Sequence, residues 1–512
     1  MSISPDEKRI SDPDCDPNPI LDLGKAKKKR RSSWSDHASN ERVDPNETLR
    51  HLFLKMRLQS LPNSGSTTPH SDSEPDSESS NPNPLIPPAP DCMSLLSDEL
   101  LLKVLSKIPD RKQHFSNSLV CKRWCVASGK LIRSIKLLDW DFLESGRLTF
   151  RFPNLVDASL VHACIQSDRN SGILLCDKLL SIHLSSGVVF ENDGVFIRNE
   201  DVLDSEEVDR GVRIMVQGCR NLRRVVLMNV SEKGLSFLGE ECECLQEMEL
   251  HYSGDLALPG IFKCRNLQIL KLIGSISGVY NSVVTDIGLT ILAQGCRRLV
   301  KLELVGCEGS YDGIKAIGQC CQMLEELTLC NHKMDGGWLS ALSYCVNLKT
   351  LKILSCNEID GNPGSDEHLW PCPMLEELHL LQCQMREKQG VRALFFVCRT
   401  IQKLVIEDCW GLNSNIFAAA GILRSIRSLS LEGCSLLTTE GLESIVLSWK
   451  ELDRLRVGSC NKVKDSEITP ELATLFSDLK ELKWRPDSKS LLQSSLAGTG
   501  IGQKGGISLR RK

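Results

Sequence analysis

The sequence of 512 residues contains no run of about 18 apolar residues, the length that a helix needs to cross a membrane. Its start, Met1 to Arg9, is polar and lacks the apolar stretch of a secretory signal. Because the formal net charge is only -4, neither nucleic acid nor a membrane surface is expected as the main partner. These absences predict a soluble intracellular protein of the nucleus and/or cytoplasm.

Metal-binding and catalytic motifs are also missing. No two of the 23 cysteines are separated by two residues, so the sequence has no Cys-x-x-Cys pair of the kind that zinc sites use. The 10 histidines are scattered, and the spacing supports no catalytic triad, carboxylate pair or phosphate-binding loop. We therefore expect no metal, no cofactor and no enzymatic activity, and interpret the cysteines as reduced packing residues.

Proline, serine and acidic residues dominate residues 1–90, which hold most of the 21 prolines. Such a segment cannot bury enough apolar area to offset its chain entropy, so we predict a disordered tail. Within it, residues 49–61 match a short amphipathic helix. A basic cluster is either a nuclear import signal or a solvated charge run, and its residues are Lys27, Lys28, Lys29, Arg30 and Arg31.

A pattern of leucines recurs from residue 222 to residue 479 at intervals of 22 to 32 residues. We call the first leucine of each unit position zero; apolar residues also stand at +3 and +5, and cysteine often stands at −3 and +8. The residues at position zero are Leu222, Leu245, Leu267, Leu299, Leu324, Leu348, Leu375, Ile401, Ile426, Leu452 and Leu479. Each unit predicts one short strand and a segment that returns the chain to the next strand. No unit can bury its own leucines, so the units must stack on one another.

One return segment shows why helices are expected between the strands. Thr285 or Asp286 is suited to cap a helix, and Ile287, Ile291 and Leu292 are expected on the face that packs inward.

The register of the repeats also predicts features outside the eleven clear units. Three further units are expected upstream, at Ile132, Leu155 and Leu179. The surplus at residues 188–210 predicts a hairpin followed by an acidic loop, and residues 356–372 are expected to be irregular.

A different pattern covers residues 91–131. Ser97 precedes Asp98 and Glu99, an arrangement typical of the start of a helix. Apolar residues then recur at helical spacing up to Pro109, which ends the pattern, and a second helical segment closes at Trp124. About forty residues are too few for an independent core, so another surface must cover some of these apolar side chains.

The repeats resemble the leucine-rich repeat of the cysteine-containing subtype, and with residues 91–131 the chain resembles a plant-like F-box/leucine-rich-repeat protein. This resemblance implies an α/β fold: a short helical F-box module followed by a horseshoe solenoid, with parallel strands on the concave side and helices on the convex side. The implied domains are a disordered tail at 1–90, an F-box at 91–131, a solenoid of about 11–14 repeats at 132–486 and a flexible Gly/Ser-rich tail at 487–512.

The resemblance also implies the function of a substrate-recognition subunit in a Skp/cullin/F-box (SCF) ubiquitin ligase. The F-box would bind a Skp-type adaptor and, through it, a cullin, while the solenoid would bind an unidentified protein substrate. The family usually begins the module with Leu-Pro, whereas this chain has Leu96-Ser97, so we expect a less rigid entrance and retained binding. The residues that match the family's adaptor-binding pattern are Leu96, Leu100, Val104, Leu105, Ile108, Pro109, Val120, Cys121 and Trp124.

Side chains at +4 and +6 are expected to point away from the core, onto the concave wall. The +4 residues mix both signs of charge, whereas an apolar row at +6 is a candidate target-binding ridge, with packing against neighbouring strand ends as the alternative. The ridge residues are Met228, Ile273, Val305, Leu354 and Leu381. Two other functions stay open: a repeat scaffold without a role in ubiquitination, and a small-molecule-dependent receptor similar to the plant auxin and jasmonate receptors.

Overall fold

The computed structural model describes residues 96–165, 173–174, 202–276, 280–281, 283–364, 369–488 and 490. The chain divides into two units, Met1–Asn81 and Pro82–Lys512, and every described residue belongs to the second unit. The predicted tail at 1–90, with its basic cluster and amphipathic segment, lies outside the described residues, as do residues 491–512.

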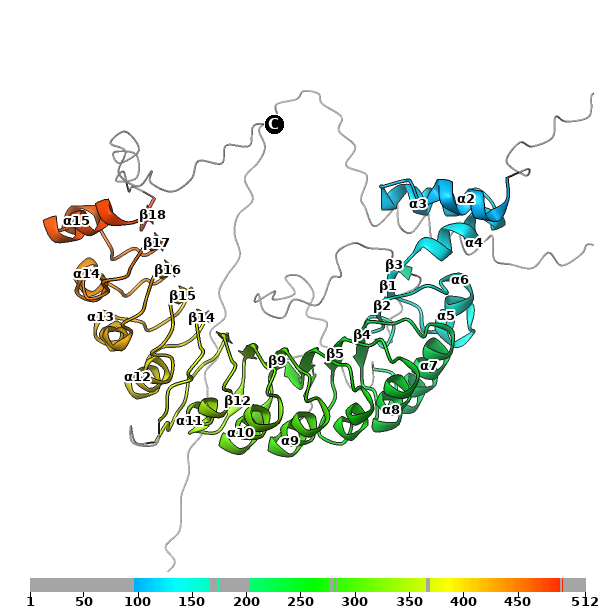
Figure 1. Cartoon of the computed structure of the whole chain (residues 1–512), viewed down its shortest axis with the longest axis horizontal. Coiled ribbons are helices and arrows are strands. Elements are labelled where there is room, and N and C mark those ends of the chain that lie inside the picture. Colours follow the sequence, from blue (N-terminus) through cyan, green and yellow to red (C-terminus); the bar gives the residue numbers. More distant parts are fainter. Residues whose placement is uncertain are drawn as a thin grey trace, which may run out of the picture. The chain divides into compact units, whose positions relative to one another are not determined.

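Three helices begin the described part of the chain: α2 (Asp98–Leu105), α3 (Arg111–Ser118) and α4 (Lys122–Leu131). We refer to them as the three-helix module. As the sequence predicts, Ser97 caps α2, because its hydroxyl accepts a hydrogen bond from the Leu100 amide at 3.3 Å. Helix α4 continues past Trp124, where the predicted segment closed, and leads directly into the first strand (Figure 1).

One sheet of 14 strands runs through the rest of the second unit. All strands except one are parallel and in register, in agreement with the predicted solenoid. The exception is β3 (Ile173–Leu174), which pairs antiparallel with β1 at the edge of the sheet. The parallel strands, in their order across the sheet, are β1 (Ser134–Leu137), β2 (Asp157–Ser159), β4 (Arg224–Met228), β5 (Glu247–His251), β6 (Ile269–Ile273), β9 (Lys301–Val305), β11 (Glu326–Cys330), β13 (Thr350–Leu354), β14 (Glu377–Leu381), β15 (Lys403–Glu407), β16 (Ser428–Glu432), β17 (Arg454–Gly458) and β18 (Glu481–Arg485).

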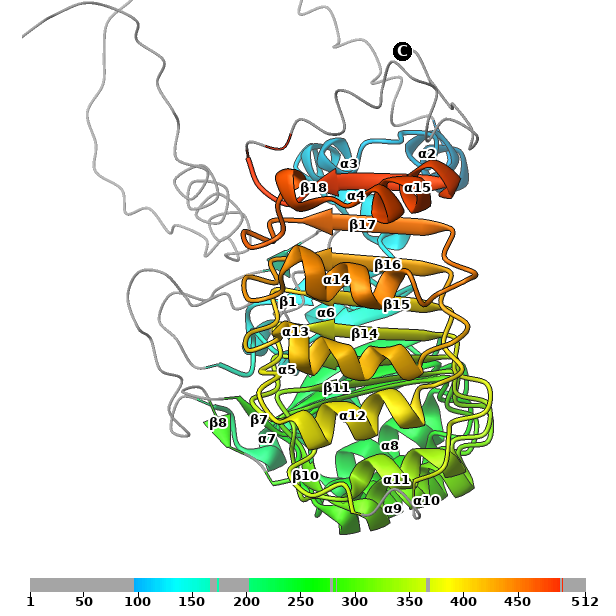
Figure 2. The same ribbon diagram turned by 90° about the vertical axis from the view of Figure 1, so that its left-hand side faces the viewer.

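Helical segments return the chain between most strands. In the second unit the strands line the inner side of an arc and the helices its outer side (Figures 1 and 2). The segments are α5 (Trp140–Glu144), α6 (Arg147–Arg151), α7 (Ser205–Gly218), α8 (Glu232–Glu241), η2 (Leu258–Lys263), α9 (Asp286–Gly295), α10 (Tyr311–Cys320), α11 (Trp338–Ala341), η3 (Leu342–Tyr344), α12 (Lys388–Val397), α13 (Ser414–Phe417), η5 (Ala418–Ile422), α14 (Thr439–Val446), η6 (Asp465–Glu467) and α15 (Pro470–Asp478). Two small strand pairs accompany them: β7 (Ser275–Ile276) with β8 (Tyr280–Asn281), and β10 (Glu308–Gly309) with β12 (Lys333–Met334).

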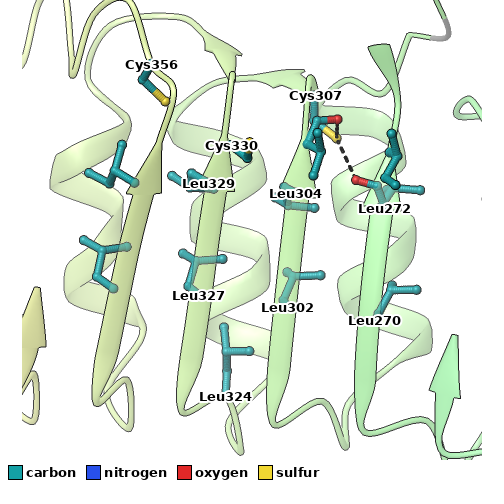
Figure 3. Packing of buried hydrophobic residues seen from close by; sticks show 14 of the residues in the cluster. Leu270, Leu272, Leu302, Leu304, Cys307, Leu324, Leu327, Leu329, Cys330 and Cys356 are labelled. Atoms are coloured by element: carbon teal, nitrogen blue, oxygen red, sulfur yellow. Dashed lines mark hydrogen bonds between the residues drawn. The ribbon is translucent and has the colours of Figure 1, made fainter. Parts of the chain in front are cut away.

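The leucines at positions zero, +3 and +5 form the core between the sheet and the helices. Leu270, Leu302 and Leu327 occupy +3 in adjacent strands, are paired in register and are fully buried (Figure 3). Each strand therefore covers the leucines of its neighbours, which is why the units are stable only as a stack. The α/β leucine-rich-repeat fold predicted from the sequence is confirmed.

Successive helices are tied together by a side-chain cap. Asp255 accepts hydrogen bonds from the amide and hydroxyl of Thr285, at 2.9 and 2.6 Å, and Thr285 is the N-cap of α9. In the next repeat Asp286 holds Ser310, the N-cap of α10, in the same way at 2.8 and 2.6 Å. A Cβ atom at Gly288 would lie 2.1 Å from Asp255 Oδ1, so a glycine at this position leaves space for the carboxylate.

Two sequence-based predictions around residues 179–210 are wrong. Strand β2 pairs directly with β4, with Asp157 opposite Arg224, so no strand of a repeat at Leu179 stands between them. The acidic residues after 203 form no loop: Asp204 caps α7 and two glutamates lie in its first turn, where the helix dipole favours acids. The predicted hairpin at residues 188–197 lies outside the described residues.

The predicted helix after Thr285 is confirmed, but one of its residues was assigned to the wrong face. Helix α9 begins at Asp286 and buries Leu289 and Leu292, whereas Ile287 is largely exposed. Residues 356–364 and 369–372, the described parts of the predicted irregular stretch, contain no helix.

Candidate functional site

The three-helix module has a very small apolar core. Leu101 and Leu105 of α2 and Ala127 of α4 are its buried apolar residues, and Trp124 and Leu131 pack against them while half-buried. This core is a separate cluster from the core of the repeats. A module of this size buries too little apolar area to be strongly stable by itself.

Large apolar side chains of the module also face solvent. Leu100 and Val104 lie one turn apart on α2 and are 52% and 55% exposed, and Val120, just before α4, is 63% exposed. These three residues belong to the predicted adaptor-binding set, and their side chains are accessible to a partner. Of the others, Pro109 and Cys121 are exposed, Leu96 and Ile108 are half-buried, and Trp124 packs on the core.

The prediction that Leu105 lies on the adaptor-binding surface is wrong. The sequence pattern grouped it with Leu100 and Val104, but its side chain is 0% exposed. The physical reason is the position of α4, which covers the face of α2 that carries Leu101 and Leu105. A charge at Leu105 would therefore disrupt the module itself and would report nothing about a partner.

Polar contacts join the ends of the module. Arg123 donates a hydrogen bond to Asp98 Oδ1 at 2.7 Å and another to the carbonyl oxygen of Leu96, so the start of α4 is held against the start of α2. Cys121 is the N-cap of α4, and its sulfur accepts from the Trp124 amide at 3.5 Å. Leu96 and Cys121 thus have roles within the module that the sequence pattern alone did not reveal.

Helix α4 is also fastened to the first repeats. Gly129 lies against α6 so closely that a Cβ atom there would be 2.2 Å from the carbonyl oxygen of Arg151. The Asn154 side chain donates to the carbonyl of Lys130 at 2.9 Å, and Arg133 donates to the carbonyl of Asn154 at 3.0 Å. The module is therefore joined to the solenoid by direct packing. A glycine inside a helical stretch was the available sequence signal for this close approach.

The apolar row at +6 is not an exposed ridge over most of its length. Met228, Ile273 and Val305 are 1%, 0% and 4% exposed, and Leu354 and Leu381 are half-buried. Neighbouring strands are in register, so the +6 side chains stand side by side about 5 Å apart and cover one another. The prediction of an exposed binding ridge is wrong for the three buried residues. They follow the alternative interpretation, in which these side chains pack against neighbouring strand ends.

Charged residues fill the concave wall over its first strands. Arg224 of β4 lies 3.2 Å from Asp157, 2.7 Å from Glu247 and 3.1 Å from Glu249. Burial alone would raise the pKa of Glu249, but the hydrogen bond with His251 at 3.0 Å and the nearby cations hold that pKa below its ordinary value. A single guanidinium therefore pairs with three carboxylates.

The same pairing continues across the middle strands. Lys271 lies 3.0 Å from Glu303, and Glu326 lies 3.1 Å from Lys301 and 2.6 Å from Lys352. A pocket of about 170 Å³ opens beside Lys271, Lys301 and Glu303, which is smaller than the roughly 300 Å³ usual for a drug-sized ligand. This part of the wall has both signs of charge and forms no single-sign groove, as the +4 residues predicted.

Comparisons with known proteins agree with this architecture. The chain is 28% identical over 191 residues to the F-box protein MAX2 homolog A of Petunia hybrida, which covers 32% of this chain and 25% of that protein. It is 24% identical over 209 residues to F-box/LRR-repeat protein 4 of Bos taurus, with 39% and 33% covered. In sequence and architecture, the chain is similar to these F-box and leucine-rich-repeat proteins. The alignments span only a quarter to a third of these relatives' lengths.

The other comparisons are more distant. No protein-family model matches the chain. Two solved structures are similar to it. The TLR13-ssRNA13 complex is 17% identical, with 65% of this chain and 46% of that chain covered and a TM-score of 0.36. The plant peptide hormone receptor RGFR1 in complex with RGF2 is 15% identical, with 52% of this chain and 48% of that chain covered and a TM-score of 0.28.

The cysteines of the repeats serve in packing. The −3 and +8 cysteines of the repeats are buried, and burial raises the pKa of Cys219 to about 11 and that of Cys242 to about 12. The cysteines within the described ranges are free thiols. In that part of the chain, no group of three or more His, Cys, Asp or Glu side chains is placed to hold a metal ion. No helix among the described residues is long and apolar enough to span a membrane.

Proposed function

We propose that this protein is the substrate-recognition subunit of an SCF-type ubiquitin ligase. In this role the three-helix module binds a Skp-type adaptor and, through it, a cullin, while the concave wall binds the protein to be ubiquitinated. The protein itself is not an enzyme. It holds the target near the conjugating machinery and so raises the effective concentration of the reacting groups.

The observation that carries this proposal is the distribution of apolar side chains in the three-helix module. Leu100, Val104 and Val120 are more than half exposed, while only three apolar residues form the buried core. Covering apolar surface gains roughly 25 cal/mol per Å², so a partner that covers this surface stabilises both the complex and the module. Likeness to proteins named for their F-box supports the choice of an adaptor as that partner.

The test replaces apolar contacts by charges without touching the core of the module. In the full chain, Leu100→Asp with Val104→Asp changes two exposed side chains of α2. We expect co-purification with a Skp-type adaptor to fall at least about tenfold, because an unpaired carboxylate in an apolar interface is costly to desolvate.

A matched control uses the same pair of residue types on the solenoid. Leu256 and Val283 are 91% and 45% exposed, and both line a surface groove of the repeats far along the chain from the module. Leu256→Asp with Val283→Asp should leave adaptor co-purification unchanged. Undiminished adaptor recovery with the α2 variant, or wild-type protein that recovers no adaptor, would refute the proposed function.

A further inference from the structure

The concave wall becomes accessible toward its C-terminal end. On β5 and β6 the side chains of Glu249 and Lys271 are 5% and 15% exposed. On β17 and β18 the equivalent side chains, Arg456 and Lys483, are 56% and 59% exposed. A partner can therefore reach charged groups on the last strands far more easily than on the first ones.

The balance of charge changes at the same place. Cations on the earlier strands, such as Arg224, Lys271 and Lys352, each lie within 4 Å of a carboxylate. The last two strands instead carry four outward-facing cations, which we call the basic end of the wall: Arg454, Arg456, Lys483 and Arg485.

Two of these four cations lie within 4 Å of a carboxylate. Arg456 lies 3.5 Å from Glu432, and Lys483 lies 2.7 Å from Glu481. Arg454 is exposed and stands in register opposite Glu481, whose pKa it helps to lower. Arg485 is exposed and forms no ion pair with any described residue. With four cations against the two carboxylates of Glu432 and Glu481, the basic end of the wall carries an excess of two positive charges on the last two strands of the sheet.

The strand geometry fixes how these cations are spaced. Arg456 is paired in register with Lys483, and Gly458 with Arg485. Neighbouring strands are about 5 Å apart and alternate residues along a strand about 7 Å apart, so the cations form a grid with these two spacings. An extended peptide also repeats its side chains about every 7 Å on one face. Acidic residues at alternate positions of such a peptide match the separation of Arg454 and Arg456.

Glu432 limits the basic end of the wall on the side of β16. The hydroxyl of Ser459 donates to Glu432 Oε1 at 3.0 Å, and a Cβ atom on Gly458 would lie 2.3 Å from Glu432 Oε2. The carboxylate is therefore held in the space above Gly458. With Glu481 on β18, it places two negative charges among the cations. Separate carboxylates can avoid these positions, whereas a continuous phosphate backbone would be repelled by them.

We propose that the basic end of the wall binds an extended acidic segment of the target protein, in which carboxylates alternate along the chain. Arg454 and Arg485 supply the charges that such a segment neutralises, and Arg456 and Lys483 orient it between them. This inference rests on the proposed function, since it assigns the target-binding part of the concave wall.

The experiment measures binding of a fluorescein-labelled (Glu-Ser)6 peptide to the full chain by fluorescence anisotropy at about 50 mM salt, where surface charges are weakly screened. We expect Arg454→Glu with Arg485→Glu to weaken binding at least about tenfold, and Arg454→Gln with Arg485→Gln to weaken it less. The matched control, Arg297→Glu with Arg424→Glu, makes the same change in charge at exposed arginines on the turns before strands, away from the wall. It should stay within twofold of wild type.

Equal losses in the wall and control variants would mean that only net charge matters and would overturn the proposal. So would wild-type protein that binds (Glu-Ser)6 no better than (Lys-Ser)6, or that binds a dT12 oligonucleotide more tightly through the same arginines. Adaptor co-purification is measured on the same preparations. If the adaptor still co-purifies but the peptide does not bind, this inference alone is refuted. If the adaptor no longer co-purifies with the wild-type protein, the proposed function is refuted.

Discussion

At the scale of single residues, His332 is a titratable side chain that the protein largely removes from water. It occupies the +8 position that Cys307 and Cys356 fill in neighbouring repeats, and it contacts the Trp338 ring at 5.2 Å between centroids. Burial lowers its pKa from 6.5 to about 4. Its Nδ1 atom accepts a hydrogen bond from the Met334 amide at 3.4 Å, which requires that nitrogen to be unprotonated.

This depressed pKa predicts that stability falls on acidification. Between pH 6.5 and about 4 the unfolded chain takes up a proton at His332 that the folded chain does not, so the free energy of unfolding decreases as pH falls through this window and is unaffected above it. From pH 7 to pH 5 the contribution is about 2 kcal/mol. The variant His332→Cys carries the residue usual at +8. Measured by urea unfolding at the two pH values, its free energy of unfolding should fall by about 2 kcal/mol less than that of the wild type. Equal drops in both proteins would contradict the prediction.

At the scale of elements, the contacts between successive helices decide where each helix starts. The cap at Thr285 could be predicted from its own neighbours in the sequence. Its partner Asp255 could not, because the two residues are 30 positions apart and meet only when the repeats are stacked. The exposed position of Ile287 has the same origin, since Leu289 and Leu292 are buried, Leu289 against Gly313 of the following repeat, and Ile287 is left outside.

The cap makes Gly288 a sensitive position. Gly288→Ala would place a methyl group 2.1 Å from Asp255 Oδ1 and 2.9 Å from Leu258 Cδ1, so the cap must move. We expect the free energy of unfolding to fall by about 1–3 kcal/mol, as for other overpacked sites. Gly421→Ala is the matched control, because its new methyl would meet Ile445 Cδ1 at an ordinary 3.6 Å. Chemical denaturation of both variants measures the difference, and equal stabilities would argue against the cap.

At the scale of the whole molecule, the leucine spacing was enough to predict the stacked strands, because that pattern is written within each repeat. The same spacing did not predict which side chains stay exposed to solvent. The burial of Met228 depends on side chains one repeat away, and the choice of Leu105 over Leu100 as a core residue depends on where α4 lies. The burial of these side chains depends on packing between segments that are distant in the sequence, and the residue spacing within one repeat carries no information about that packing.

The separation of the two apolar cores predicts unequal stability along the chain. The three-helix module has its own small cluster around Leu101 and Leu105, and it meets the repeats through the close contact of Gly129 with Arg151. A small cluster opens at a lower free energy than the continuous core of β13 to β16. Hydrogen exchange should therefore be at least about tenfold faster for amides of α2 and α4 than for those central strands. Gly129→Ala should speed exchange in α4 and leave the central strands unchanged, because its methyl disturbs only the junction. Equal protection of the module and the central strands would mean that the two clusters unfold as one, and that the junction transmits far more stability than its few contacts suggest.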